Sequence, residues 1–208
     1  MVSCICAVIA NEHLTGTTKR GAIVANLIYS MGASLDGYIS GPDGTFDWTA
    51  PDEELHRFHN ERVRALGGHL LGRRLYETMV YWETAHEDPA APDYYLEFAD
   101  IWKALPKVVF SNTLDEVVGN TRLARGGIAE EAAKLMEQTG KDVAIGGSEL
   151  ASEAMKLGLI DEFHVFVYPA VVGGGAPFFP ALDQTIHLTL AEARTFGDRV
   201  VLLRYERA

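Results

Sequence analysis

Apolar residues follow two patterns that alternate along the chain. Short apolar runs that end in glycine or polar residues predict strands. Such runs lie in residues 26–40, where a strand feeds a loop, and in residues 67–72, 107–112, 141–147 and 161–179, with a further short run at 121–125. Residues 187–207 carry two alternating runs around Phe196-Gly197-Asp198, which predicts a hairpin.

Helical spacing of apolar residues occupies most of the intervals between these runs. The predicted helices are residues 52–66, 73–80, 93–103, 127–138 and 148–157. The first follows Pro51 and carries Glu53 and Glu54 in its first turn, where carboxylates suit the helix dipole. Strands that alternate with helices predict a mostly parallel sheet with helices on both faces, and the hairpin adds an antiparallel edge.

The chain has no internal repeat and no proline-rich linker. We therefore expect one domain over residues 26–208, preceded by an extension, residues 1–25, that is poorly ordered. Cys4 and Cys6 fall in this extension and lie too close in sequence for a structural disulfide, so we expect reduced thiols.

Charge restricts the class of partner. The 208 residues carry a formal net charge of −11, which argues against nucleic acid or an anionic membrane surface. An acidic chain that binds an anion must hold it with a local basic cluster, so neighbouring arginines are informative. No segment is apolar enough to span a membrane, and we expect a cytoplasmic protein.

Histidines give little sign of a metal site. His56 and His59 are the only two that lie close together on a predicted helix, and no third ligand has a matching spacing. We therefore expect no metal ion.

The strand ends carry the candidate chemistry, because ligands of open α/β sheets bind beyond the carboxyl ends of the strands. Four ends are unusual: residues 32–37, Gly72-Arg73-Arg74, Ser111-Asn112-Thr113 and Gly146-Gly147-Ser148. The glycine turn lets the backbone approach a ligand ahead of helical N–H groups that bind anions. A plain tight turn capped by Ser148 is the alternative.

The paired arginines stand at a predicted helix start, where the helix dipole disfavours cations. Arg73 and Arg74 therefore indicate an anion nearby, with a solvated helix start as the alternative. Residues 111–113 fit either a contact with adenosine or phosphate or an ordinary polar loop.

Five stretches in the same order carry a family resemblance: SLDGYISGPDG…DW, LLGRRLYET, KVVFSNTL, AIGGSEL and DEFHVFVYPAVVGGGAPFF. Together they resemble the dihydrofolate reductase superfamily, specifically its RibD C-terminal-like (riboflavin-type reductase) branch, over nearly all of residues 26–208. The resemblance implies a three-layer α/β fold with a central, mostly parallel eight-stranded sheet. It also implies an NADPH-dependent reductase that acts on a small heterocycle, such as a pterin or a ribosylaminopyrimidine, and a homodimer.

The resemblance further implies the residues of the cofactor site. Gly72 and Arg73, with Arg74 as a helper, would bind the 2′-phosphate of the adenosine, although Leu75 stands where the family has a threonine. The other implied contacts are Gly32 and Ile39 beside the nicotinamide, Ser111, Asn112 and Thr113 on the adenosine side, and Gly146, Gly147, Ser148, Glu149 and Leu150 at the pyrophosphate turn.

Carboxylates are the candidate catalytic residues. Dihydrofolate reductases place one carboxylate early in the first helix, which implies Asp52, Glu53 or Glu54, with Glu53 or Glu54 nearest by spacing from Trp48. Asp36 belongs to the loop beside the nicotinamide. The zinc deaminase signature of the bifunctional riboflavin enzymes, H-x-E followed by P-C-x-x-C, is absent.

Two other functions remain open. A non-catalytic NADP(H)-binding sensor, or a degenerate reductase, is suggested by Leu75 and by the unassigned carboxylate. A conventional NAD-dependent dehydrogenase is the third, and the late position of Gly146-Gly147 counts against it.

Overall fold

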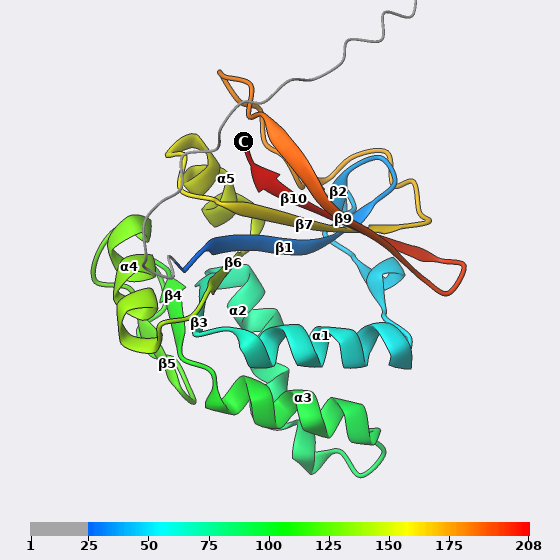
Figure 1. The fold of residues 1–208 in the computed structure, drawn as a ribbon. Helices are drawn as coiled ribbons and strands as arrows, with labels where there is room; N and C mark the ends of the chain where they lie inside the picture. Colours follow the sequence, from blue (N-terminus) through cyan, green and yellow to red (C-terminus); the bar gives the residue numbers. More distant parts are fainter. Residues whose placement is uncertain (1–24) are drawn as a thin grey trace, which may run out of the picture.

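The computed structural model describes residues 25–208. Apart from Ala25, the expected N-terminal extension, including Cys4 and Cys6, lies outside the described residues. The remaining chain forms a three-layer α/β fold (Figure 1).

Eight strands form the central sheet in the order β5-β4-β3-β6-β1-β7-β10-β9. Their bounds are β1 Leu27–Ser34, β3 Gly68–Gly72, β4 Lys107–Phe110, β5 Thr121–Leu123, β6 Val143–Gly146, β7 Glu162–Tyr168, β9 Leu188–Phe196 and β10 Val200–Arg207. The strands from β5 to β7 in this order pair in parallel, whereas β10 is antiparallel to both β7 and β9. The predicted parallel sheet with an antiparallel hairpin at one edge is confirmed.

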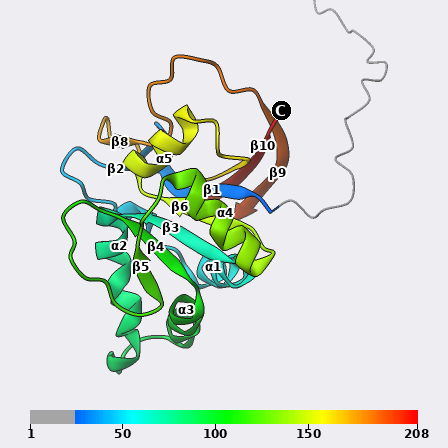
Figure 2. The same cartoon turned by 90° about the vertical axis from the view of Figure 1, so that its left-hand side faces the viewer.

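Helices cover both faces of the sheet, as Figures 1 and 2 show. Their bounds are α1 Glu53–Ala65, α2 Arg73–Met79, α3 Asp93–Ala104, α4 Ile128–Thr139 and α5 Ser148–Lys156, with the short 3₁₀ turns η1 Asp47–Thr49, η2 Val80–Glu83 and η3 Ala85–Glu87. The predicted helix 73–80 corresponds to α2, which ends one residue earlier, and a turn of 3₁₀ helix, η2, begins at Val80. The helices α4 and α5 pack on one face, and α1, α2 and α3 pack on the other.

Side chains along β7 point alternately to the two faces of the sheet, so this strand packs against both layers of helices. Phe163 and Val165 join the core beneath α4 and α5, whereas Phe166 and Tyr168 join a cluster with Leu55 of α1. Successive side chains of a strand point to opposite faces, so a strand in the middle of the sheet must be apolar on both.

A small second sheet was not predicted. Strand β2 (Tyr38–Ser40) pairs antiparallel with β8 (Ala176–Pro177), so the loop after β1 lies against the glycine-rich loop after β7. Neither stretch has the length or alternation that predicts a strand, because the pairing joins two loops that only the fold brings together.

A buried carboxylate positions the loop that follows β5. Glu131 of α4 is fully buried and accepts hydrogen bonds from the backbone N–H groups of Arg125, at 2.9 Å, and Gly126, at 3.0 Å. Its other oxygen binds the guanidinium of Arg122, which is the largest of the causes that lower the pKa of Glu131 from 4.5 to about 2. The carboxylate thereby holds residues 124–126 against the start of α4.

Replacing Glu131 by Gln is expected to lower the free energy of unfolding at neutral pH by on the order of 3 kcal/mol, because each pKa unit corresponds to about 1.4 kcal/mol. A lowered pKa stabilises the fold above the unfolded value, and this stability is lost as the pH falls through the folded value. The difference between wild type and variant, measured by denaturant unfolding, should therefore shrink from about pH 5 towards pH 2.

The neighbouring substitution Glu130→Gln is the control. Glu130 pairs with Lys134 on the exposed surface of the same helix, so its loss should change stability by less than about 1 kcal/mol. Equal effects of the two substitutions would contradict the role given to Glu131.

Candidate functional site

A groove of 650 Å³ opens at the edge where the parallel strands end. It is lined by the ends of β3, β4 and β6 and by the residues that follow β5. The lining residues are Gly72, Arg73, Arg74, Leu75, Phe110, Ser111, Asn112, Thr113, Ala124, Arg125, Gly126, Gly147, Ser148, Glu149, Leu150 and Glu153. We call it the outer groove.

Most of the cofactor contacts expected from the sequence line the outer groove. They are Gly72, Arg73, Arg74, Ser111, Asn112, Thr113, Gly147, Ser148, Glu149 and Leu150. Gly32 lines a second cavity, described below. Ile39 packs against the core, and Gly146 lies directly beneath the groove, so neither is among the lining residues.

Polar contacts cross the outer groove between elements that are distant in sequence. Nη1 of Arg73 donates to Oγ1 of Thr113 at 3.3 Å, which joins α2 to the residues after β4. Nη1 of Arg74 lies 3.4 Å from Oε1 of Glu149 on α5, and both of these side chains are highly exposed. Arg73 also lies 3.9 Å from Oε1 of Glu77. Exposed ion pairs are weak, so both arginines remain available to bind an anion beside the polar residues 111–113.

Arg125 is a third arginine of the outer groove, and sequence reasoning missed it. It follows β5 directly, and Glu131 holds its backbone. Ligands of open α/β sheets bind beyond the carboxyl ends of the strands, and this applies to the end of β5 as much as to the other strand ends. The short run at 121–125 lacked a clear strand pattern, so its end was not treated as a site.

The ends of β3 and β6 approach each other through glycine. Gly147 has φ = +95°, and a Cβ atom placed on it would lie 3.5 Å from the backbone of Gly72. A Cβ atom on Gly146 would lie 2.4 Å from the side chain of Leu75. Glycine at these positions brings the first turn of α5 against the start of α2, which shapes the floor of the outer groove.

A second cavity, of 570 Å³, lies between α1 and the sheet. We call it the inner cavity. Gly32, Leu75 and Tyr168 lie towards or just beyond the carboxyl ends of β1, β3 and β7, and we call this end of the cavity, which also includes Thr49, its mouth. Other polar and aromatic residues of the lining are Ser30, His59, Arg62, His69, Glu162, His164, Phe166 and Arg204. Leu75 also lines the outer groove, so the two cavities meet at this side chain.

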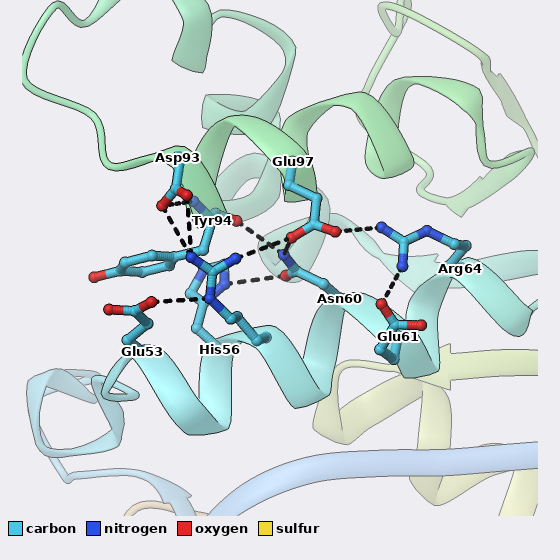
Figure 3. Close-up of polar contacts among 9 residues, drawn as sticks. Glu53, His56, Asn60, Glu61, Arg64, Asp93, Tyr94 and Glu97 are labelled. Atoms are coloured by element: carbon cyan, nitrogen blue, oxygen red, sulfur yellow. Dashed lines mark hydrogen bonds and ion pairs between the residues drawn. The ribbon is translucent and has the colours of Figure 1, made fainter.

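Helix α1 forms the roof of the inner cavity and is tied to α3 by a polar network (Figure 3). The amide nitrogen of Asn60 donates to the Tyr94 carbonyl and to Glu97, each at 2.9 Å. Its amide oxygen must then accept from Nδ1 of His56, at 3.0 Å. Burial is the main cause that lowers the pKa of His56, so this histidine is neutral at neutral pH.

A buried chain of polar groups crosses the inner cavity. Nε2 of His164 lies 2.8 Å from Oε2 of Glu162, and the other nitrogen, Nδ1, contacts the guanidinium of Arg62. Hydrogen bonding from His164 is the largest cause that lowers the pKa of Glu162. Glu162 is therefore a carboxylate, Nε2 of His164 carries the proton, and Nδ1 accepts from Arg62.

Burial shifts the pKa values of other groups in the inner cavity. Desolvation lowers the pKa of His59 to about 3 and that of His69 to about 4, and it raises the pKa of Tyr168 to about 12. Both imidazoles and the phenol are therefore uncharged at neutral pH. Nδ1 of His69 is buried and has no hydrogen-bond partner within residues 25–208.

The three expected catalytic carboxylates lie elsewhere. Asp36 accepts from Oγ of Ser34 at 2.6 Å and from the N–H groups of Val172 and Gly173, so it ties the two loops together. Glu53 pairs with Arg57 at 2.9 Å on the exposed side of α1, and Glu54 is exposed. None of the three lines the outer groove or the inner cavity.

The resemblance implied a carboxylate early in the first helix, and this role stays a prediction, since neither Glu53 nor Glu54 is among the lining residues of the inner cavity. Asp52 caps α1, and the turn that follows directs Glu53 and Glu54 away from the sheet. The side chains that α1 presents to the inner cavity are His56, His59 and Arg62. The helical spacing of these three residues is visible in the sequence. Histidine and arginine are not among the catalytic residue types that the resemblance implied.

Within residues 25–208, no three His, Cys, Asp or Glu side chains are grouped so as to hold a metal ion. The same residues contain no helix with the length and apolar character needed to cross a membrane.

Comparison with known proteins gives consistent results. The RibD C-terminal domain family matches residues 25–202. The uncharacterized protein YyaP of Bacillus subtilis (strain 168) is 31% identical over 183 residues, which cover 86% of this chain and 93% of YyaP.

Two solved structures show the same fold at low identity. The dihydrofolate reductase of Enterococcus faecalis, complexed with NADP(H), has a TM-score of 0.57 and 16% identity, with 88% of this chain and 96% of that chain covered. A Thermotoga maritima diaminohydroxyphosphoribosylaminopyrimidine deaminase/5-amino-6-(5-phosphoribosylamino)uracil reductase has a TM-score of 0.63 and 16% identity, over 88% of this chain and 57% of that longer chain. The fold is therefore that of dihydrofolate reductase.

The geometry of the glycine turn can be tested directly. Gly147→Ala is expected to lower the free energy of unfolding by about 1–3 kcal/mol, because a side chain at φ = +95° is strained. Gly174→Ala is the control, since it has an ordinary φ and its Cβ would meet nothing closer than 3.6 Å. If thermal unfolding shows equal effects, the strained turn does not shape the groove as described.

Proposed function

The chain belongs to the RibD C-terminal domain family, and from that premise we propose that it is an NADPH-dependent reductase of a small heterocyclic substrate. The observation that supports this proposal most strongly is that two cavities lie side by side and share one lining residue, Leu75. The outer groove gathers arginines, hydroxyls and a glycine turn from four strand ends, and it meets the inner cavity at Leu75.

The residues of the outer groove fit a dinucleotide phosphate. Arg73, which Thr113 orients, would hold the 2′-phosphate, and Ser111 and Asn112 lie beside it for the adenosine. The N–H groups that begin α5 at Gly147 and Ser148 would bind the pyrophosphate. Three arginines in a chain of net charge −11 are a local cluster of the kind that an acidic protein needs to bind a phosphate.

The inner cavity suits the substrate. A volume of 570 Å³ lies within the range of small-molecule sites, and aromatic rings of Phe166 and Tyr168 provide apolar walls for a planar heterocycle. Bound NADPH would supply the hydride, and the protein would hold the substrate against it and exclude water. Gly32 would lie beside the nicotinamide, and its missing side chain lets the ring of Tyr168 pack against β1, because a Cβ atom there would lie 3.0 Å from that ring.

Proton supply is assigned by elimination. No carboxylate of the expected set lines the inner cavity. Of the two carboxylates that do, Asp142 accepts from the backbone N–H of Asn26 at 2.7 Å, and Glu162 is held ionised by His164 and Arg204. Tyr168 at the mouth stays protonated at neutral pH, since burial raises its pKa to about 12. We infer that a proton reaches the substrate from water at the mouth, with Tyr168 as a hydrogen-bond donor there.

The homodimer and the cytoplasmic location stay predictions. A pterin-like or ribosylaminopyrimidine-like substrate is part of the proposal, because either class is planar and small enough for the inner cavity.

The 2′-phosphate assignment predicts a selective effect on the cofactor. Arg73→Ala should raise the Kd of NADPH by roughly 10- to 100-fold, the range of a charge-assisted hydrogen bond, and should change the Kd of NADH little. Arg73→Lys, which retains the charge, should give an intermediate value. Fluorescence titration of both cofactors measures the result, and an equal loss for NADPH and NADH would remove the assignment.

Turnover separates a reductase from a binding protein. Stopped-flow mixing of the NADPH complex with 7,8-dihydropterin or a ribosylaminopyrimidine should show loss of nicotinamide absorbance. Tight binding of both compounds without oxidation of NADPH would favour the sensor, a function also supported by the position of Glu53 and Glu54 outside the cavity lining.

A further inference from the structure

His69 of β3 has an imidazole that forms no side-chain hydrogen bond within residues 25–208. Its Nδ1 is buried and unpaired, and its ring lies edge-on to that of Trp102, with 6.2 Å between the centroids. Burial lowers the pKa of His69 to about 4, so the ring is neutral at neutral pH and carries one proton. Buried N–H groups without a partner are rarer than buried acceptors without one, which places this proton on Nε2.

The Nε2 atom of His69 lies over β6, the strand beside β3. A Cβ atom placed on Gly146 would lie 3.2 Å from Nε2 and 2.4 Å from the side chain of Leu75. Ala144 is the strand partner of His69, and Gly146 follows it by two residues, nearer the carboxyl end of β6. The imidazole therefore leans along the sheet towards the mouth of the inner cavity, which His69 and Leu75 both line.

Strand β6 places only small residues on the face beneath the inner cavity. Ala144 pairs with His69 on one side and with Ile28 of β1 on the other, and Gly146, two residues later, faces the same way. Neighbouring strands lie about 4.8 Å apart, so roughly 10 Å separates β3 from β1. We call the floor over Ala144 and Gly146 the β6 trough. A planar ring can lie flat on this floor with its edges towards β3 and β1.

Ser30 borders the β6 trough on the side of β1. Tyr29 pairs with Ile145, so the next residues along the two strands, Ser30 and Gly146, are neighbours. Ser30 is half-buried and lines the inner cavity, and its hydroxyl has no hydrogen bond in the part of the chain that the structure describes. A hydroxyl can both donate and accept. The β6 trough therefore has an uncharged, unpaired polar group at each of its two sides.

We propose that His69 is a specificity-determining residue, whose Nε2–H donates to a carbonyl oxygen or an unprotonated ring nitrogen of the substrate, while Ser30 bonds the opposite edge of the same ring. The inference rests on the proposed function and narrows its substrate class to a planar heterocycle with an acceptor on the edge that faces β3. Gly32, beside which the nicotinamide would lie, is two residues, roughly 7 Å, beyond Ser30. The ring in the β6 trough is therefore that of the substrate.

Binding of two uncharged probes tests this hydrogen bond without requiring turnover. Uridine and 7,8-dihydropterin are titrated by calorimetry into the full chain saturated with NADP⁺. His69→Leu should weaken the binding of at least one probe by about 5- to 100-fold, because the acceptor of the probe is then buried without a partner. His69→Gln, which places an amide N–H near the position of Nε2, should lose less than His69→Leu does.

Two further substitutions accompany these variants. Ser30→Ala removes only the hydroxyl on the other side of the β6 trough, and it should also weaken the binding of the same probe. This small change keeps the test valid if substitution of His69 impairs folding. His86→Gln is the control, because His86 is exposed and pairs with Asp100 of α3 outside both cavities, so probe binding should not change.

Nitrogen-15 NMR of the histidine side chains gives a readout that a purely structural role would not change. The signals of His69 are identified by their loss in His69→Gln. In the NADP⁺ complex the ring should be the Nε2–H tautomer, and a saturating probe should slow the exchange of this proton with water. A proton on Nδ1, or exchange that the probe leaves unchanged, overturns the assignment.

Other results also decide against His69. Absence of binding by both probes overturns the proposal, and so does equal binding to wild type and His69→Leu. If His69→Leu lowers the melting temperature alone, the residue is structural, and if it raises only the Kd of NADPH, Nε2–H belongs to the cofactor.

Failure of this assignment and failure of the proposed function give different results. A chain that prefers NADPH over NADH but binds the probes equally with and without His69 has lost only the role of His69. A chain whose probe binding depends on His69 but which binds NADPH and NADH equally has lost only the cofactor assignment.

Discussion

Parallel pairing of β1 with β6 and β7 is the constraint on which the rest of the structure depends. The central strand β1 forms hydrogen bonds along both edges, and its residues face a layer of helices on each side. Because all strands from β5 to β7 in the sheet order run the same way, their carboxyl ends gather at one edge. The outer groove and the mouth of the inner cavity both lie at that edge.

The titratable groups of the two cavities differ in how well they are solvated. The outer groove is open, so Arg73, Arg74 and Arg125 remain hydrated and can attract a phosphate without a large desolvation cost. Around the inner cavity, burial of the side chains keeps His59 and His69 uncharged, and hydrogen bonds hold Glu162 as a carboxylate. Charged side chains remain in the lining as well, and Arg204 pairs there with the carboxylate of Glu162 at 3.1 Å.

Patterns in the sequence located the helices and strands well, because their periodicity reflects burial that the fold imposes. The hairpin at residues 187–207 and the helix after Pro51 are examples. The pairing of β2 with β8 could not be predicted from such patterns, because strands of three and two residues are too short to show a periodicity. The structural roles of Asp36 and Glu53 were likewise not visible in the sequence. Packing between two loops brings Gly173 to Asp36, and the orientation of α1 places Glu53 and Arg57 on its exposed side.

The sequence by itself determined the fold class, the family resemblance and the set of strand ends that carry arginine, serine and glycine. Those properties follow from local propensity and from periods of two and 3.6 residues, which act within one element. Only the tertiary structure decided that Arg73 meets Thr113 and that His59 and Arg62 face a cavity with His69 and His164. The residues of that cavity come from α1, β3 and β7. Contacts between elements that are distant in sequence depend on how the layers pack, and no local pattern encodes this packing.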